Sequence, residues 1–138
     1  MAVIEELIRT ESDGSISFGN YELDKKTKRS DFEAGGDLYK IKTFREITRL
    51  ERNDTVLYES VPGTSVTGMK MEGGCLHFTV EGHDDAQITL GLGEDVEYRV
   101  VINGSPADLI RTNMGGKLSF SIDLAETGKA DVEIMEVD

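Results

Sequence analysis

Strict alternation of apolar and polar residues is the feature that most constrains this chain. From Gly116 to Leu124 every second residue is apolar, and the residues between them are polar or charged. The apolar members are Leu118, Phe120, Ile122 and Leu124. Because successive side chains of a strand point to opposite faces of a sheet, this period of two predicts a strand with one buried face.

Similar short segments follow one another through the second half of the chain. We expect strands over residues 64–70, 75–81, 86–92, 97–103, 107–112 and 130–137. Their predicted inward residues include Leu76, Phe78, Val80, Ile88, Leu90, Leu92, Val132 and Ile134. Asn103-Gly104 supplies the positive φ angles of a tight hairpin turn. Seven strands at this spacing predict an immunoglobulin-like or fibronectin III-like antiparallel β-sandwich over residues 62–138.

The first half of the chain is harder to interpret. Ser15–Leu23 predicts a strand, a turn and a second strand, and the basic stretch Lys25–Arg29 predicts an exposed loop. Apolar residues recur at every third position from Leu38 to Leu50, which is compatible with a helix. The β-branched residues in this segment and the turn-forming pair Asn53-Asp54 favour strands instead.

A change in composition near residue 61 suggests two units. Residues 1–61 carry a net charge of −3 and residues 62–138 carry −9. Val61-Pro62-Gly63 interrupts the chain between them, since Pro and Gly both end regular structure. We therefore predict a β-rich lobe over residues 1–61 and the sandwich over residues 62–138.

The net charge of −12 limits the classes of partner. Nucleic acids and anionic membranes are bound through clustered Lys and Arg, so neither is an expected partner. The single Cys75 excludes an intrachain disulfide, and the first residues lack the basic start and apolar core of a signal peptide. We expect a cytoplasmic protein.

Few residues suggest chemistry. His83-Asp84-Asp85 could contribute to a metal site or act as a general base, but a polar turn between two strands explains it as well. Cys75 and His77 share one strand face, so a histidine could approach the thiol, although an inactive thiol is the simpler interpretation. The sequence contains no phosphate-binding loop, because neither Gly35-Gly36 nor Gly115-Gly116 is followed by Lys-Ser/Thr.

Carboxylates and tyrosines suggest two kinds of binding. Asp84-Asp85 and Glu94-Asp95 could line loops at one end of the sandwich and hold calcium, or form solvated turns. Four tyrosines could stack on sugar rings if they were exposed, although aromatic residues in strands more commonly belong to the core. They are Tyr21, Tyr39, Tyr58 and Tyr98.

Two longer stretches carry a resemblance to a known group of proteins. They are Gly36–Asn53 (GDLYKIKTFREITRLERN) and Val56–Gly63 (VLYESVPG). Both resemble small proteins of anaerobic Firmicutes labelled endosialidase or endosialidase catalytic chain. The same resemblance extends to three shorter segments, FTVEG (78–82), AQITL (86–90) and TNMGGKLS (112–119). The resemblance implies a glycan-processing activity. The chain is too short for the catalytic β-propeller of endosialidases, and only Arg99 and Arg111 in the second half could meet a sialic acid carboxylate.

These observations leave three hypotheses in order. The first is a non-catalytic interaction or structural module that binds a protein partner or self-associates. The second is a carbohydrate-binding or endosialidase-related protein, and the third is calcium binding by the acidic loops of residues 81–97. The sequence identifies no catalytic residue, metal ligand or cofactor site.

Overall fold

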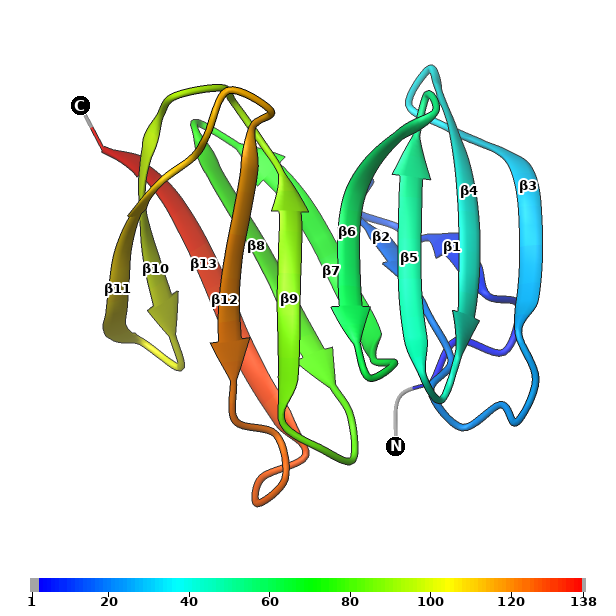
Figure 1. Ribbon diagram of the computed structural model, residues 1–138. Helices are drawn as coiled ribbons and strands as arrows, with labels where there is room; N and C mark the ends of the chain where they lie inside the picture. Colours follow the sequence, from blue (N-terminus) through cyan, green and yellow to red (C-terminus); the bar gives the residue numbers. More distant parts are fainter. Residues whose placement is uncertain (1–2, 138) are drawn as a thin grey trace.

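The computed structural model describes residues 3–137, which form two antiparallel β-sheets packed face to face (Figure 1). Strands β1 to β13 lie between residues 8 and 137, and the described residues contain no helix. Accordingly, none of residues 3–137 belongs to a helix long and apolar enough to cross a membrane. The predicted all-β, antiparallel, sandwich-like fold is confirmed.

Each sheet combines strands that are distant in the sequence. The seven-stranded sheet has the order β1 (Ile8–Thr10), β2 (Ile16–Phe18), β7 (Ser65–Glu72), β8 (Cys75–Glu81), β13 (Lys129–Val137), β10 (Glu97–Ile102) and β11 (Ser105–Arg111). The six-stranded sheet has the order β12 (Lys117–Ile122), β9 (Ala86–Gly91), β6 (Thr55–Val61), β5 (Ile47–Arg52), β4 (Asp37–Phe44) and β3 (Thr27–Ala34). Strands β3 and β12 are therefore the two edges of the six-stranded sheet.

Both sheets contain strands from the two halves of the chain. β6 of the first half pairs with β9 of the second, and β2 pairs with β7. A cis peptide bond joins Val61 to Pro62, at the connection that leads from the six-stranded sheet to the seven-stranded one. The predicted boundary at residues 61 and 62 thus coincides with a crossover between the sheets.

The core follows the predicted alternation. Leu118, Phe120 and Ile122 of β12 are buried, and the residues between them are exposed. Tyr58 lies near the middle of the core, where its ring meets Phe18 and Phe78 edge-on, at centroid distances of 5.2 and 5.8 Å. Edge-on packing brings the positive rim of one ring to the negative face of another.

A chain of buried hydroxyl groups connects the sheets inside this core. The Thr43 and Thr48 hydroxyls are 2.9 Å apart, and the Thr48 hydroxyl donates to the carbonyl oxygen of Thr64 at 2.7 Å. The Thr64 hydroxyl lies 2.7 Å from both the Tyr58 and the Ser60 hydroxyls. All five residues are fully buried, so their hydroxyls depend on one another and on nearby backbone groups for hydrogen bonds.

Turn chemistry explains the hairpins that the sequence predicts. Asn53 and Asp54 join β5 to β6 with φ angles of 50° and 67°, and Asn103-Gly104 joins β10 to β11 with 52° and 81°. Positive φ at both central residues matches the twist of the flanking strands. Residues 38–50 form β4 and β5, so the strand prediction for this segment is confirmed.

Two local predictions for the first half are wrong. Residues 27–29 are not loop but the start of β3, an edge strand whose charged side chains face water, as edge strands commonly do. In Ser15–Leu23 only Ile16–Phe18 is a strand, and the following residues form a turn. There the Asn20 side chain accepts a hydrogen bond from the backbone of Glu22 at 3.0 Å.

Candidate functional site

The two histidines lie in different surroundings, and one of them shares a hollow with the cysteine. The His83 ring packs edge-on against Tyr21 with centroids 4.8 Å apart, whereas His77 is exposed on β8. Cys75 and His77 line one hollow together, as their shared strand face predicts. Burial and then the neighbouring Glu133 carboxylate raise the pKa of the Cys75 thiol, which disfavours the reactive thiolate.

Asp84-Asp85 and Glu94-Asp95 do not meet at one end of the sandwich, which contradicts the calcium alternative and agrees with solvated turns. Asp84 and Asp85 precede β9, whereas Glu94 and Asp95 follow it; six residues of strand put about 16–20 Å between the pairs. Asp85 accepts hydrogen bonds from the backbone of Leu124 and Ala125, both at 3.1 Å. Among the described residues, no group of three or more His, Cys, Asp or Glu side chains could hold a metal ion.

The tyrosines considered for sugar stacking are buried, and the two arginines of the second half lie on neighbouring strands. All four tyrosines are buried, with exposed fractions of 0 to 7%, which confirms the core interpretation over stacking platforms. Arg99 lies opposite Leu109 in the β10–β11 pair, and Arg111 lies opposite Glu97. The two arginines are therefore diagonal neighbours on one face of the sheet, and Arg111 forms an ion pair with Asp95 at 3.2 Å.

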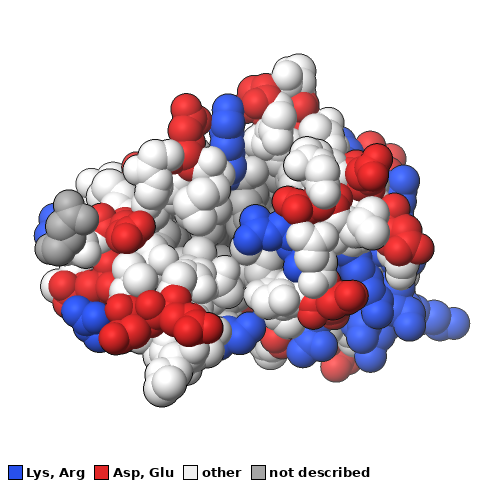
Figure 2. All heavy atoms as spheres, turned by 90° about the horizontal axis from the view of Figure 1, so that it is seen from above, with Lys and Arg blue, Asp and Glu red and all other residues white. Residues whose placement is uncertain are grey.

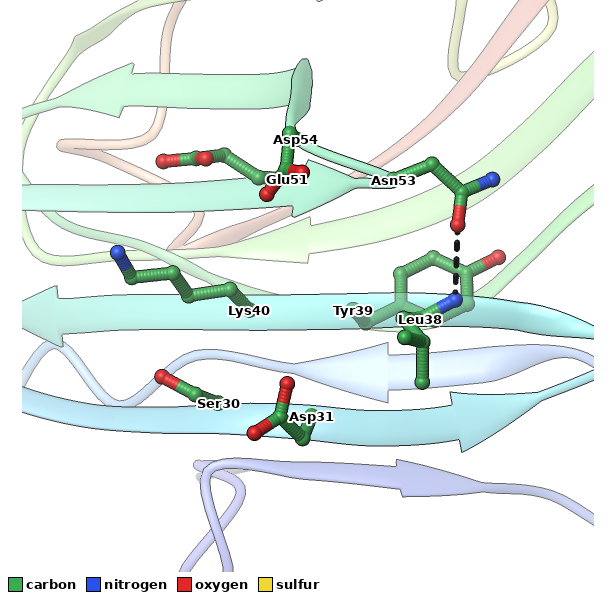
Figure 3. Close-up of a pocket in the computed structure, with 8 residues that line it drawn as sticks. All are labelled: Ser30, Asp31, Leu38, Tyr39, Lys40, Glu51, Asn53 and Asp54. Atoms are coloured by element: carbon green, nitrogen blue, oxygen red, sulfur yellow. Dashed lines mark hydrogen bonds between the residues drawn. The ribbon is translucent and has the colours of Figure 1, made fainter.

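A polar hollow of about 420 Å³ opens beside the β3–β4–β5 end of the six-stranded sheet (Figure 3). Its lining comprises Ser30, Asp31, Leu38, Tyr39, Lys40, Glu51, Asn53 and Asp54. The Asn53 side chain accepts a hydrogen bond from the Leu38 backbone at 3.0 Å and donates to Asp37 at 2.9 Å, which holds one wall in place. A register shift in β3 between Arg29 and Phe32 places Ser30 and Asp31 there, and no sequence signal marks that shift.

The outer face of the same sheet carries a row of cations. Lys28 of β3 lies opposite Lys42 of β4, which lies opposite Arg49 of β5. Arg49 lies in turn opposite Glu59 of β6, and its guanidinium forms an ion pair with that carboxylate at 3.4 Å. Since Thr43 and Thr48 are fully buried, their neighbours Lys42 and Arg49 point to the outer face.

The cations of this row are only partly neutralised. Loss of contact with water, and then the charges of four other basic side chains, lower the pKa of Lys42; the four are Lys26, Lys28, Arg49 and Lys40. The Arg49 Nε atom is buried and has no hydrogen-bond partner. Like charges directly opposite each other on neighbouring strands destabilise a sheet. An anionic group from outside would relieve this repulsion.

An apolar stripe runs beside the cationic row. Phe44 and Ile47 form the last pair of the β4–β5 hairpin and are half-buried. Val61, on the adjacent β6, is 52% exposed. None of the three belongs to the core cluster, and the Lys26 ammonium lies 6.0 Å from the centroid of the Phe44 ring. We call the stripe and the cations Lys26, Lys28, Lys40, Lys42 and Arg49 the docking face.

The docking face is basic, whereas the molecule as a whole is acidic. Residues 25–52 hold nine of the fifteen Lys and Arg residues and only five Asp and Glu, a net charge of +4 in a chain of net −12. Figure 2 shows basic side chains gathered at the end of the molecule formed by β3 to β5. Sequence reasoning found the basic stretch at residues 25–29 but placed it in a loop, and so missed its alignment with Lys42 and Arg49.

The docking face combines charged side chains with exposed apolar ones. Its cations can orient an anionic group, and its stripe can bury apolar side chains. Comparison with known proteins adds no relative to this description, since no family model, curated protein or solved structure matches the chain.

Proposed function

We propose that the protein is a non-catalytic interaction module that binds an acidic protein surface through the docking face. The observation that carries this proposal is the apolar stripe Phe44–Ile47–Val61 beside three cations in direct cross-strand register. Interfaces commonly combine an apolar centre with Arg and aromatic residues. A partner of this chemistry would bury the stripe and neutralise the row in the same step.

Several finer predictions accompany this proposal. The immunoglobulin-like or fibronectin III-like character of residues 62–138, their separation from residues 1–61 and a cytoplasmic location all stay predictions. The resemblance to proteins labelled endosialidase likewise stays a prediction. The proposed module needs neither a cofactor nor a metal ion.

Amide chemical shifts measured during a titration with poly-L-glutamate short enough to lie within the docking face test the proposal. We expect shift changes confined to β3–β6 in the wild type, and their loss in the double variant Lys28→Glu/Lys42→Glu. Arg99→Glu/Lys70→Glu is a matched control, because it makes the same charge change on exposed positions of the seven-stranded sheet. Unchanged shifts on β3–β6, or equal losses in both double variants, would refute the docking face.

The polar hollow supports glycan binding as a second candidate function. Its carboxylates, amide and ammonium could hydrogen-bond sugar hydroxyls, although its one aromatic residue, Tyr39, is buried. A panel of sialylated and neutral oligosaccharides tests this candidate by thermal unfolding. A glycan that binds should raise the thermal midpoint of the protein by several degrees at about a hundred times its Kd. We expect Asp31→Ala to abolish the shift for a glycan bound there; a flat panel rules the candidate out.

A further inference from the structure

We propose that the partner of the docking face is the acidic end of a second copy of this same chain. The inference rests on the proposed function, because it names the occupant of the same face. It concerns two loops that lie side by side at the lower end of the molecule in Figure 1.

The acidic end is formed by the loops that join β8 to β9 and β12 to β13. With the flanking strand ends Glu81 and Lys129, these loops contain five acidic side chains and one basic side chain, a net charge of −4. The acidic members are Glu81, Asp84, Asp85, Asp123 and Glu126. A backbone hydrogen bond from Gly82 to Gly128, 3.1 Å long, and the contacts of Asp85 with Leu124 and Ala125 hold the two loops together. This end therefore presents a defined anionic surface.

The two surfaces match in charge and in chemistry. The docking face carries five cations, of which Arg49 is paired with Glu59, and the acidic loops carry an excess of carboxylates. Asp84, Asp123 and Glu126 are exposed. At physiological salt the screening length is about 8 Å, so these local charges outweigh the net charge of the whole molecule.

The order of the strands keeps the cationic row itself away from the acidic loops within one molecule, although Arg45 of the β4–β5 turn and Asp84 line one hollow. The acidic loops adjoin β9 and β12, and the cationic row lies on β3, β4 and β5. With neighbouring strands about 4.8 Å apart, β9 and β4 are about 14 Å apart, and β12 and β3 about 24 Å. A contact between the acidic loops and the row Lys28, Lys42 and Arg49 is therefore one between molecules.

A two-fold symmetric pair satisfies both surfaces at once. The β4–β5 hairpin and the acidic loops lie at the same end of the sandwich (Figure 1). If two six-stranded sheets face each other about an axis parallel to their strands, the β3–β5 side of each copy meets the β9–β12 side of the other. Such self-complementary pairs are the commonest form of protein oligomer.

A second copy also fits better than a long polyanion. A nucleic acid or an anionic membrane extends well beyond the docking face, where the rest of this acidic molecule would repel it. The acidic end of a second copy is confined to two short loops. It therefore neutralises the cationic row without bringing a continuous line of negative charge along the molecule.

Sedimentation of the full chain with paired charge reversals tests this inference. We expect a dimer at about 0.15 M salt that dissociates when the salt is raised severalfold. Lys28→Glu/Lys42→Glu and Asp84→Lys/Glu126→Lys should each weaken self-association at least about tenfold, since they place like charges together. A mixture of the two double variants should form a one-to-one complex, and Arg99→Glu/Lys70→Glu should behave as the wild type.

The outcomes separate the partner from the docking face itself. A wild type that stays monomeric at about 1 mM, or variants that fail to complement each other when mixed, overturns the second copy as partner. If poly-L-glutamate still shifts the β3–β6 amides in that case, the docking face stands and another acidic protein occupies it. If neither poly-L-glutamate nor a second copy of the chain binds the docking face, both proposals fail. Circular dichroism checks that each variant is folded.

Discussion

The Tyr58 hydroxyl shows how single residues make the two sheets interdependent. It is fully buried, and its partner is the hydroxyl of Thr64, which also meets Ser60. A buried hydroxyl without a partner costs about 1–3 kcal/mol. This group of hydroxyls therefore favours one packing of the sheets over others of similar apolar content.

Replacing Thr64 by Val tests this role. Valine keeps the shape of threonine but leaves the hydroxyls of Tyr58 and Ser60 without their partner, so we expect a loss of about 2–4 kcal/mol in the free energy of unfolding. Urea denaturation measures the loss. Thr89→Val is the control, because Thr89 meets Ser119 on the solvent-exposed face. A similar loss in both variants would contradict the explanation.

Tyr58 also predicts how stability depends on pH. Burial raises the pKa of Tyr58 far above its ordinary value of 10.0. The native state then holds this proton at pH values where the unfolded chain has released it, so stability falls as the pH rises above about 10. Urea midpoints at pH 8 and pH 11 should fall less for Tyr58→Phe than for the wild type, and equal falls would exclude Tyr58 as the cause. Burial also raises the pKa values of Tyr21 and Tyr39. These two tyrosines account for the fall in stability that remains in Tyr58→Phe.

At the scale of elements, β3 is an edge strand and also part of the proposed docking face. Its charged outward residues oppose pairing with strand edges of other molecules. The same residues place Lys28 next to Lys42, where repulsion lowers stability. The sheet thus retains an unfavourable charge arrangement, as binding sites commonly do at some cost in stability.

The variant Lys42→Glu separates binding from stability. A carboxylate between Lys28 and Arg49 replaces two repulsions with two attractions, so we expect a higher urea midpoint together with loss of poly-L-glutamate binding. Lys117→Glu on β12, whose strand partner is Gly91, should change neither property. A lower midpoint for Lys42→Glu would show that the row is not under repulsion.

At the scale of the whole molecule, the sharing of strands decides how the chain folds. β6 has β9 as one of its two neighbours, and the core cluster includes buried residues of both halves, such as Ile41 and Ile88. Separating residues 1–61 from residues 62–138 would expose the paired edges of β6 and β9 and part of the core. Strand pairing therefore favours a single cooperative unit over two lobes that fold alone.

Expression of the two fragments checks this expectation. We expect residues 1–61 to show the circular dichroism of an unfolded chain and to lack a cooperative thermal transition. Mixing the fragments should restore both the β signal and the transition. A cooperative transition in isolated residues 1–61 would instead support the predicted boundary between two lobes.

Local sequence determined the strands and most of the turns of this protein. The alternation in Lys117–Ile122 and the pairs Asn53-Asp54 and Asn103-Gly104 act within a few residues, so their effect is visible in the sequence. Lys25–Arg29 has the composition of a loop and of a charged edge strand alike, and only pairing with β4 distinguishes them. The tertiary structure alone decided that Lys28, Lys42 and Arg49 form a row and that Asp84-Asp85 and Glu94-Asp95 lie at opposite ends of β9. Both depend on strand order and register, which arise from contacts between residues far apart in the chain.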